Sequence, residues 1–179
     1  EFDHIIPVSK GGSNTARNIE LDARSATERR ARRSSPTARL ESGVTAISAG
    51  ESHSCAVTST GAAKCWGSGG NGRLGNGGTT TSSVPVDVVG LSSGTASIAA
   101  GGNFGCALTS AGGLKCWGNN TYGQMGIGSI TSTFLTPVDV TGLTSGVAQV
   151  RTGNHFVCAL TSAGAVTCWG ANTFQQLGV

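Results

Sequence analysis

Two sets of residues in this chain carry side chains that could do chemistry. The first set lies near the start, where a carboxylate, Asp3, directly precedes an imidazole, His4, and Asn18 follows. A carboxylate beside an imidazole can hold a divalent metal and take a proton from water. The second set is six cysteines in three pairs, each with nine residues between partners: Cys55 and Cys65, Cys106 and Cys116, and Cys158 and Cys168.

The first set belongs to a recognisable motif. Asp3-His4-Ile-Ile-Pro7 is followed by Ser9-Lys10-Gly11-Gly12 and then by Asn18-Ile19-Glu20-Leu21, and this pattern resembles the core of HNH endonucleases. The resemblance implies a small ββα segment over residues 1–34, in which a β-hairpin and a helix grip one divalent metal. It also implies that Asp3 is a metal ligand, that His4 is the general base, and that Asn18 holds the loop that aims His4.

The motif departs from the family on the helix. The resemblance places a His or Asn metal ligand nine residues after the Asn, and that position is Thr27 here, whose neutral hydroxyl is a weaker ligand than imidazole. The helix itself is expected, because Asp22 is a good N-cap and Pro36 lies just beyond its end. Two hypotheses stay open: a divalent-metal site with Asp3 and Thr27, or a degenerate remnant that serves as a linker and needs no cofactor.

Positive charge is concentrated in the same segment. Residues 1–40 hold eight basic and five acidic side chains, whereas residues 41–179 hold four of each, so the net charge of +3 comes from the N-terminal segment. Any affinity for DNA is therefore predicted for the N-terminal helix. The side chains that would contact phosphates, or else form an ordinary solvated helix face, are Arg24, Arg29, Arg30, Arg32 and Arg33.

The cysteines belong to a repeat that occupies the rest of the chain. Trp66, Trp117 and Trp169 are 51 and 52 residues apart, and the cysteines keep the same spacing. With only 12% charged residues and 29 glycines, the composition favours short strands joined by tight turns. Each unit is predicted to hold four strands, beginning with an extended Pro-Val-Asp-Val segment such as Pro85–Val88 and finishing with a hairpin that ends in Cys-Trp-Gly. No apolar run approaches the length of a membrane helix.

The repeat has a family resemblance. Ser54-Cys55-Ala-Val-Thr-Ser, followed by Lys64-Cys65-Trp66-Gly and by Asn71-Gly-Arg-Leu-Gly, resembles the regulator of chromosome condensation repeat in its Cys-rich bacterial form. The resemblance covers residues 36–179 and implies β-propeller blades. The predicted fold is mostly β: after the HNH-like segment, a partial β-propeller of three four-stranded blades over residues 35–179, with blades at about 36–84, 85–136 and 137–179. Because three blades cannot close a ring and the chain begins at Glu1 without Met, we expect a fragment or processed product, or self-association that completes the propeller.

Hairpin geometry brings the cysteines of each pair together. The tip Ser59-Thr60-Gly61 fits a three-residue loop with glycine in the left-handed conformation, which places Cys55 directly opposite Cys65. Opposed residues of this kind can be bridged by a disulfide. Buried free thiols are the alternative, and zinc is disfavoured because no Cys-x-x-Cys is present. Disulfides would predict an extracellular or cell-surface location.

Two histidines in the repeats are interpreted as structural. His53 and His155 are taken as equivalent positions, with Phe104 at the same position in the middle unit. A catalytic imidazole would not be exchanged for phenylalanine, so both histidines are expected to pack within turns.

The leading hypothesis is a non-catalytic interaction scaffold whose protein partner binds the propeller loops, with no membrane partner. The alternative is a metal-dependent HNH DNA endonuclease, or a DNA-binding protein, with the propeller as its targeting module. Guanine-nucleotide exchange, which the resemblance also suggests, is less favoured because the repeat region is neutral and chromatin binding needs a basic surface. We expect no DNA cleavage, because Asp3 would be the only strong metal ligand.

Overall fold

The structure of this protein is a computed structural model that describes residues 43–130 and 132–179. The chain divides into two units, Glu1–Thr37 and Ala38–Val179, and all described residues belong to the second. Within them no helix is long and apolar enough to cross a membrane. The predictions for Asp3, His4, Asn18, Thr27 and the N-terminal arginines lie outside the described residues.

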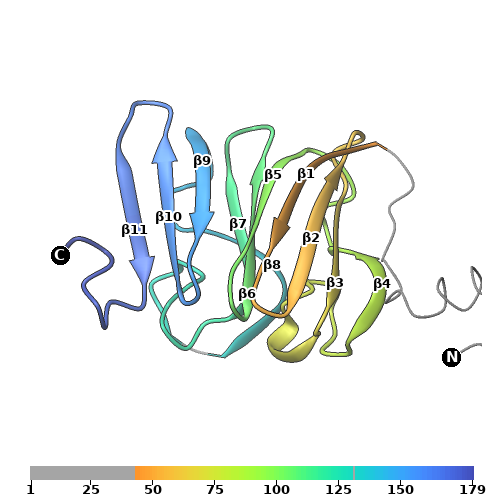
Figure 1. The fold of residues 1–179 in the computed structure, drawn as a ribbon. Helices are drawn as coiled ribbons and strands as arrows, with labels where there is room; N and C mark the ends of the chain where they lie inside the picture. Colours follow the sequence, from red (N-terminus) through yellow and green to blue (C-terminus); the bar gives the residue numbers. More distant parts are fainter. Residues whose placement is uncertain (1–42, 131) are drawn as a thin grey trace, which may run out of the picture. The chain divides into compact units, whose positions relative to one another are not determined.

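The described residues are mostly β and form three antiparallel sheets, which follow one another along the chain and lie side by side (Figure 1). The first sheet contains β1 (Val44–Ala49), β2 (His53–Thr58), β3 (Ala63–Gly67) and β4 (Ser82–Asp87), with a 3-10 turn, η2 (Gly70–Gly72), between β3 and β4. The second sheet contains β5 (Thr95–Ala100), β6 (Phe104–Thr109), β7 (Leu114–Asn119) and β8 (Thr133–Asp139). The third contains β9 (Val147–Thr152), β10 (Phe156–Thr161) and β11 (Val166–Gly170).

The grouping of strands differs from the sequence expectation at one point. The Pro-Val-Asp-Val segments were expected to begin a unit, but β4 and β8 hydrogen-bond to the last hairpin strand of the sheet that precedes them. In the first sheet Lys64 pairs with Asp87 in the ladder, and their side chains form a 2.6 Å ion pair. The third sheet therefore has three strands within the described residues, not four. The physical reason is that the chain returns to the same sheet after the loop 68–81 and crosses to the next sheet only after β4.

The hairpins agree with the prediction in detail. Gly61 has a φ of +78°, the left-handed value that the three-residue tip requires. Cys55 lies directly opposite Cys65, and the same register recurs in the other two sheets. All six cysteines are joined in these pairs as disulfides, each with a Cα–Cα distance of 4.1 Å.

Neighbouring sheets pack chiefly through the first strand of the later sheet. Strand β5 lies against β1 and β2, and β9 lies against β5 and β6. Successive sheets packed in this way are blades of a β-propeller, as predicted. We call the contact between the first and second sheets the first junction, and the contact between the second and third sheets the second junction. Each junction is filled by one apolar cluster of buried residues.

Candidate functional site

Three turns, one from each sheet, meet where β1, β5 and β9 end. Residues 49–51, 100–102 and 152–154 line a shallow hollow of about 280 Å³, which we call the turn hollow. Backbone hydrogen bonds connect adjacent turns: Glu51 N–H donates to the Gly101 carbonyl (3.3 Å), and Gly102 N–H donates to the Asn154 carbonyl (3.0 Å). The three sheets therefore present one continuous surface at this end.

An aromatic ring or imidazole lies directly behind a glycine of each turn. A Cβ placed on Gly101 would lie 2.3 Å from Phe104 Cε1, so this contact excludes any side chain at the glycine. The same contact joins Gly50 to the His53 ring and Gly153 to the Phe156 ring. Because glycine has no side chain, each ring packs directly against the backbone of its turn.

The equivalence assigned to His155 from the sequence is wrong. His53 pairs with Gly67 at the start of β2, and Phe104 and Phe156 pair with the corresponding glycines at the starts of β6 and β10. Phe156 is therefore the counterpart of His53. His155 lies one residue earlier and stacks at a tilt on Tyr122, with ring centroids 5.2 Å apart.

His53 is the one polar member of this set of rings. The residue is 3% exposed, and neither ring nitrogen has a hydrogen-bond partner in the described residues. Burial, followed by the positive charge of Arg73, lowers the pKa of His53 to about 4. The Phe104 backbone acts in the opposite direction and is the smallest of the three effects on the pKa of His53. His53 is thus a neutral imidazole held in the first junction at physiological pH.

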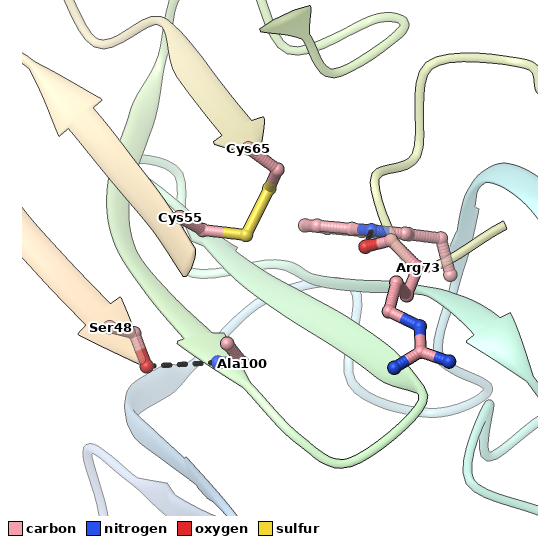
Figure 2. Close-up of a disulfide and its surroundings, with 6 residues drawn as sticks. Ser48, Cys55, Cys65, Arg73 and Ala100 are labelled. Atoms are coloured by element: carbon pink, nitrogen blue, oxygen red, sulfur yellow. Dashed lines mark hydrogen bonds between the residues drawn. A yellow bond between two sulfur atoms is a disulfide. The ribbon is translucent and has the colours of Figure 1, made fainter. Parts of the chain in front are cut away.

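Arg73 completes this polar region and was missed by sequence reasoning. The residue is 8% exposed; its Nε donates to the Gly70 carbonyl (2.8 Å), and its Nη1 donates to the carbonyl of Gly102 on the turn hollow (3.3 Å). Burial lowers the pKa of the guanidinium and the charge of Glu51 opposes this, but arginine stays charged. Figure 2 shows the guanidinium pointing away from the Cys55–Cys65 disulfide.

A signal for Arg73 was present in the repeat. The motif Asn71-Gly-Arg-Leu-Gly has Gln124 and Gln176 at the arginine position in the other two units. A charged residue that replaces a neutral one in only one copy of a repeat identifies a position where that copy has a different environment. The turn hollow itself had no such signal, because its lining comes from three turns about 50 residues apart in the chain.

The polar groups on this surface are the turn backbones and the side chains of Glu51, Thr152 and Asn154. Such groups can donate or accept hydrogen bonds at a protein interface. Within residues 43–130 and 132–179, no group of three or more His, Cys, Asp or Glu side chains could hold a metal ion. Of the predicted site residues, only the cysteines lie among the described residues, where each pair forms a disulfide within one sheet.

Comparison with known proteins extends this picture. Two models of the Regulator of chromosome condensation (RCC1) repeat match the chain, one over residues 44–73, 96–124 and 147–176, the other over residues 63–108 and 112–160. The human E3 ubiquitin-protein ligase HERC2 is 37% identical over 136 residues, which are 74% of this chain and 3% of the ligase.

Solved structures show the same arrangement of sheets. Human WBSCR16 matches with a TM-score of 0.66 and 26% identity, covering 74% of this chain and 34% of that one. Yeast RCC1 (Prp20), solved bound to Kap60, matches with a TM-score of 0.67 and 24% identity, covering 79% of this chain and 32% of that one. The chain therefore spans about a third or less of each of these relatives.

Proposed function

This chain belongs to the regulator of chromosome condensation repeat family, and we propose that it is a non-catalytic interaction module whose protein partner binds at the turn hollow. The observation that carries the proposal is the convergence of three turns, one from each sheet, on one hydrogen-bonded surface. A rigid scaffold that presents short turns in this way suits recognition, because the partner meets a surface that needs no reordering.

The charge of the surface favours a particular kind of partner segment. Glu51 is exposed at the rim, whereas the guanidinium of Arg73 is buried behind Gly102. The charge carried by the lining residues themselves is therefore negative, and a segment with a basic side chain among hydrogen-bonding neighbours would complement it. Prp20, which shares the fold, is bound to the protein Kap60 in its solved structure, and this supports protein partners by analogy of fold alone.

We further propose that the module works in an oxidising compartment, outside the cell or on its surface. Three cross-strand disulfides, one in each sheet, support this location, because such bonds persist where thiols are not kept reduced. Mass mapping of peptides from natively produced, non-reduced protein should find all six cysteines paired. Six free thiols would contradict the proposed location.

The binding proposal is tested in two steps. Chemical cross-linking first identifies a partner protein, and variants of the turn hollow are then titrated against that purified partner. Glu51→Arg and Asn154→Arg together should weaken binding by about tenfold or more, since they place charge and bulk on the contact surface. Lys115→Gln, on an exposed ion pair of β7 and β8 away from the hollow, is the matched control and should bind normally. Equal affinity of the hollow variant and the control would overturn the proposed site.

A plasmid-nicking assay with magnesium, manganese or zinc tests the non-catalytic part of the proposal. We expect no cleavage by the unmodified chain. Cleavage that disappears in His4→Ala would overturn it and favour the HNH endonuclease alternative.

A further inference from the structure

The two junctions use the same pair of faces. At each junction one sheet contributes what we call its leading face, which carries the Cys pair, and the next contributes its trailing face, which carries the tryptophan. At the first junction Leu74 and Val88 of the leading face are buried with Ile98 and Trp117 of the trailing face. At the second junction Met125 and Val140 of the leading face pack with Val150 and Trp169 of the trailing face. Sheets of this chain are thus built to stack head to tail.

A hydrogen bond between indole and backbone recurs at both junctions. Trp117 Nε1 donates to the Arg73 carbonyl, and Trp169 Nε1 donates to the Gln124 carbonyl, each at 2.9 Å. The turn beneath the indole is glycine, and a Cβ on Gly75 would lie 2.8 Å from Trp117 Nε1. Both junctions therefore combine an apolar contact with an indole-to-carbonyl hydrogen bond at equivalent positions.

The first and third sheets carry the same two faces without partners among the described residues. Ile47, on the trailing face of the first sheet, is 78% exposed, whereas its counterparts Ile98 and Val150 are 7% and 2% exposed. Val166, on the leading face of the third sheet, is 66% exposed, whereas its counterpart Leu114 is fully buried. These apolar side chains occupy positions that the junctions elsewhere bury.

The directional bond is likewise incomplete at these two faces. The matching atoms are Trp66 Nε1 on the first sheet and the Gln176 carbonyl oxygen on the third, and no hydrogen bond joins either atom to another described residue. Gly178, the counterpart of Gly75, has no atom within 4 Å of its Cβ position. The third sheet thus offers an open glycine turn and an acceptor, and the first sheet offers an indole donor.

We propose that these faces bind each other between two copies of this chain, so that the third sheet of one copy packs on the first sheet of the next. The contact reproduces the internal junctions: Val166 covers Ile47, and Trp66 Nε1 donates to the Gln176 carbonyl of the neighbouring copy. It is a heterologous contact, in which two different surfaces meet, and it leaves one free face of each kind on every pair.

Sedimentation of the 179-residue chain over a range of concentrations tests this proposal. Wild type should form dimers. Ile47→Lys and Val166→Lys should each weaken association by about tenfold or more, since each places a charge at the centre of the contact. Ile130→Lys is the matched control, because Ile130 is 72% exposed on the loop before β8 and lies on neither face. Circular dichroism spectra that match wild type would show that all three variants fold.

Mixing the two variants distinguishes a head-to-tail contact from any symmetric one. The Val166 of an Ile47→Lys copy is intact, and so is the Ile47 of a Val166→Lys copy, so one good contact forms between them. An equimolar mixture should therefore dimerise, whereas each variant alone should stay mostly monomeric. A monomeric wild type, association unaffected by either substitution, or a mixture that stays monomeric would each overturn the proposal.

Discussion

The two junctions between sheets share one backbone scheme but differ in what fills them. The first junction contains the buried His53 and Arg73 and the half-buried Ser48, whose Oγ accepts a 2.9 Å hydrogen bond from Ala100 N–H (Figure 2). The second junction has Phe104 at the position of His53 and the buried but uncharged Gln124 at the position of Arg73, together with Leu108, Leu114 and Met125 from the same sheet. The repeat thus fixes the backbone arrangement of each junction, and the side chains that differ between copies decide whether the junction buries titratable or charged groups.

The titratable His53 and the charged Arg73 give the first junction consequences that the second lacks. A buried imidazole without hydrogen-bond partners opposes protonation, and a buried guanidinium needs backbone acceptors. The first junction is therefore expected to be sensitive to pH, whereas the second should respond mainly to loss of apolar volume. The predictions that follow use this contrast.

The largest effect is expected for the tryptophans. Trp117 is fully buried at the first junction, so Trp117→Ala should cost about 3–5 kcal/mol through lost burial, the cavity, and the lost bond to the Arg73 carbonyl. Trp169 makes the same bond but is partly exposed, so Trp169→Ala should cost less. Urea unfolding measures both. A larger loss of unfolding free energy for Trp169→Ala than for Trp117→Ala would contradict this prediction.

Acidification should destabilise the first junction. The pKa of His53 is lowered to about 4 from an ordinary 6.5, so above pH 6.5 the imidazole is neutral in both states and contributes nothing. As pH falls from 6.5 to 4, His53 becomes protonated in the unfolded chain but stays mostly neutral in the folded chain. The free energy of unfolding therefore falls by about 3 kcal/mol. His53→Phe, which copies Phe104 and Phe156, should remove this part of the pH profile. Identical profiles for wild type and variant would contradict the prediction.

The disulfides should not distinguish the junctions. Cys55–Cys65 and Cys106–Cys116 are fully buried, and both have a sequence separation of 10. On the chain-entropy model each stabilises by roughly 2–3 kcal/mol through the unfolded state, so replacing either pair by alanines should lower stability by similar amounts. Thermal melts of the two double variants provide the comparison. A difference well beyond 1 kcal/mol would mean that the packing around one pair dominates.

The smallest effect is expected at Ser48. Ser48→Ala removes the side-chain acceptor for Ala100 N–H and should cost about 1 kcal/mol. Alanine already occupies the equivalent position in the second sheet, at Ala99, so the fold itself tolerates the change. Hydrogen exchange of the Ala100 amide provides the local readout, and it should become faster in the variant while the core of the second junction stays protected.

Short-range features of this protein could be predicted from the sequence alone. The hairpin tip at Gly61, the opposition of Cys55 and Cys65, and the period of the repeat all follow from residues within one hairpin or from direct comparison of the copies. Such features depend on local backbone geometry, and strand alternation and turn type fix them before any sheet meets another. The predictions for the N-terminal segment stay predictions.

Only the tertiary structure decided where one sheet ends and the next begins. A repeat reveals its period but not its phase, so the segment at Pro85–Val88 could belong to either neighbouring sheet until the ladder of β3 and β4 assigned it. The match of His53 with Phe156, the burial of Arg73 and the turn hollow likewise came from the structure. Burial and the turn hollow depend on packing between residues about 50 positions apart, and no local pattern encodes which faces will meet.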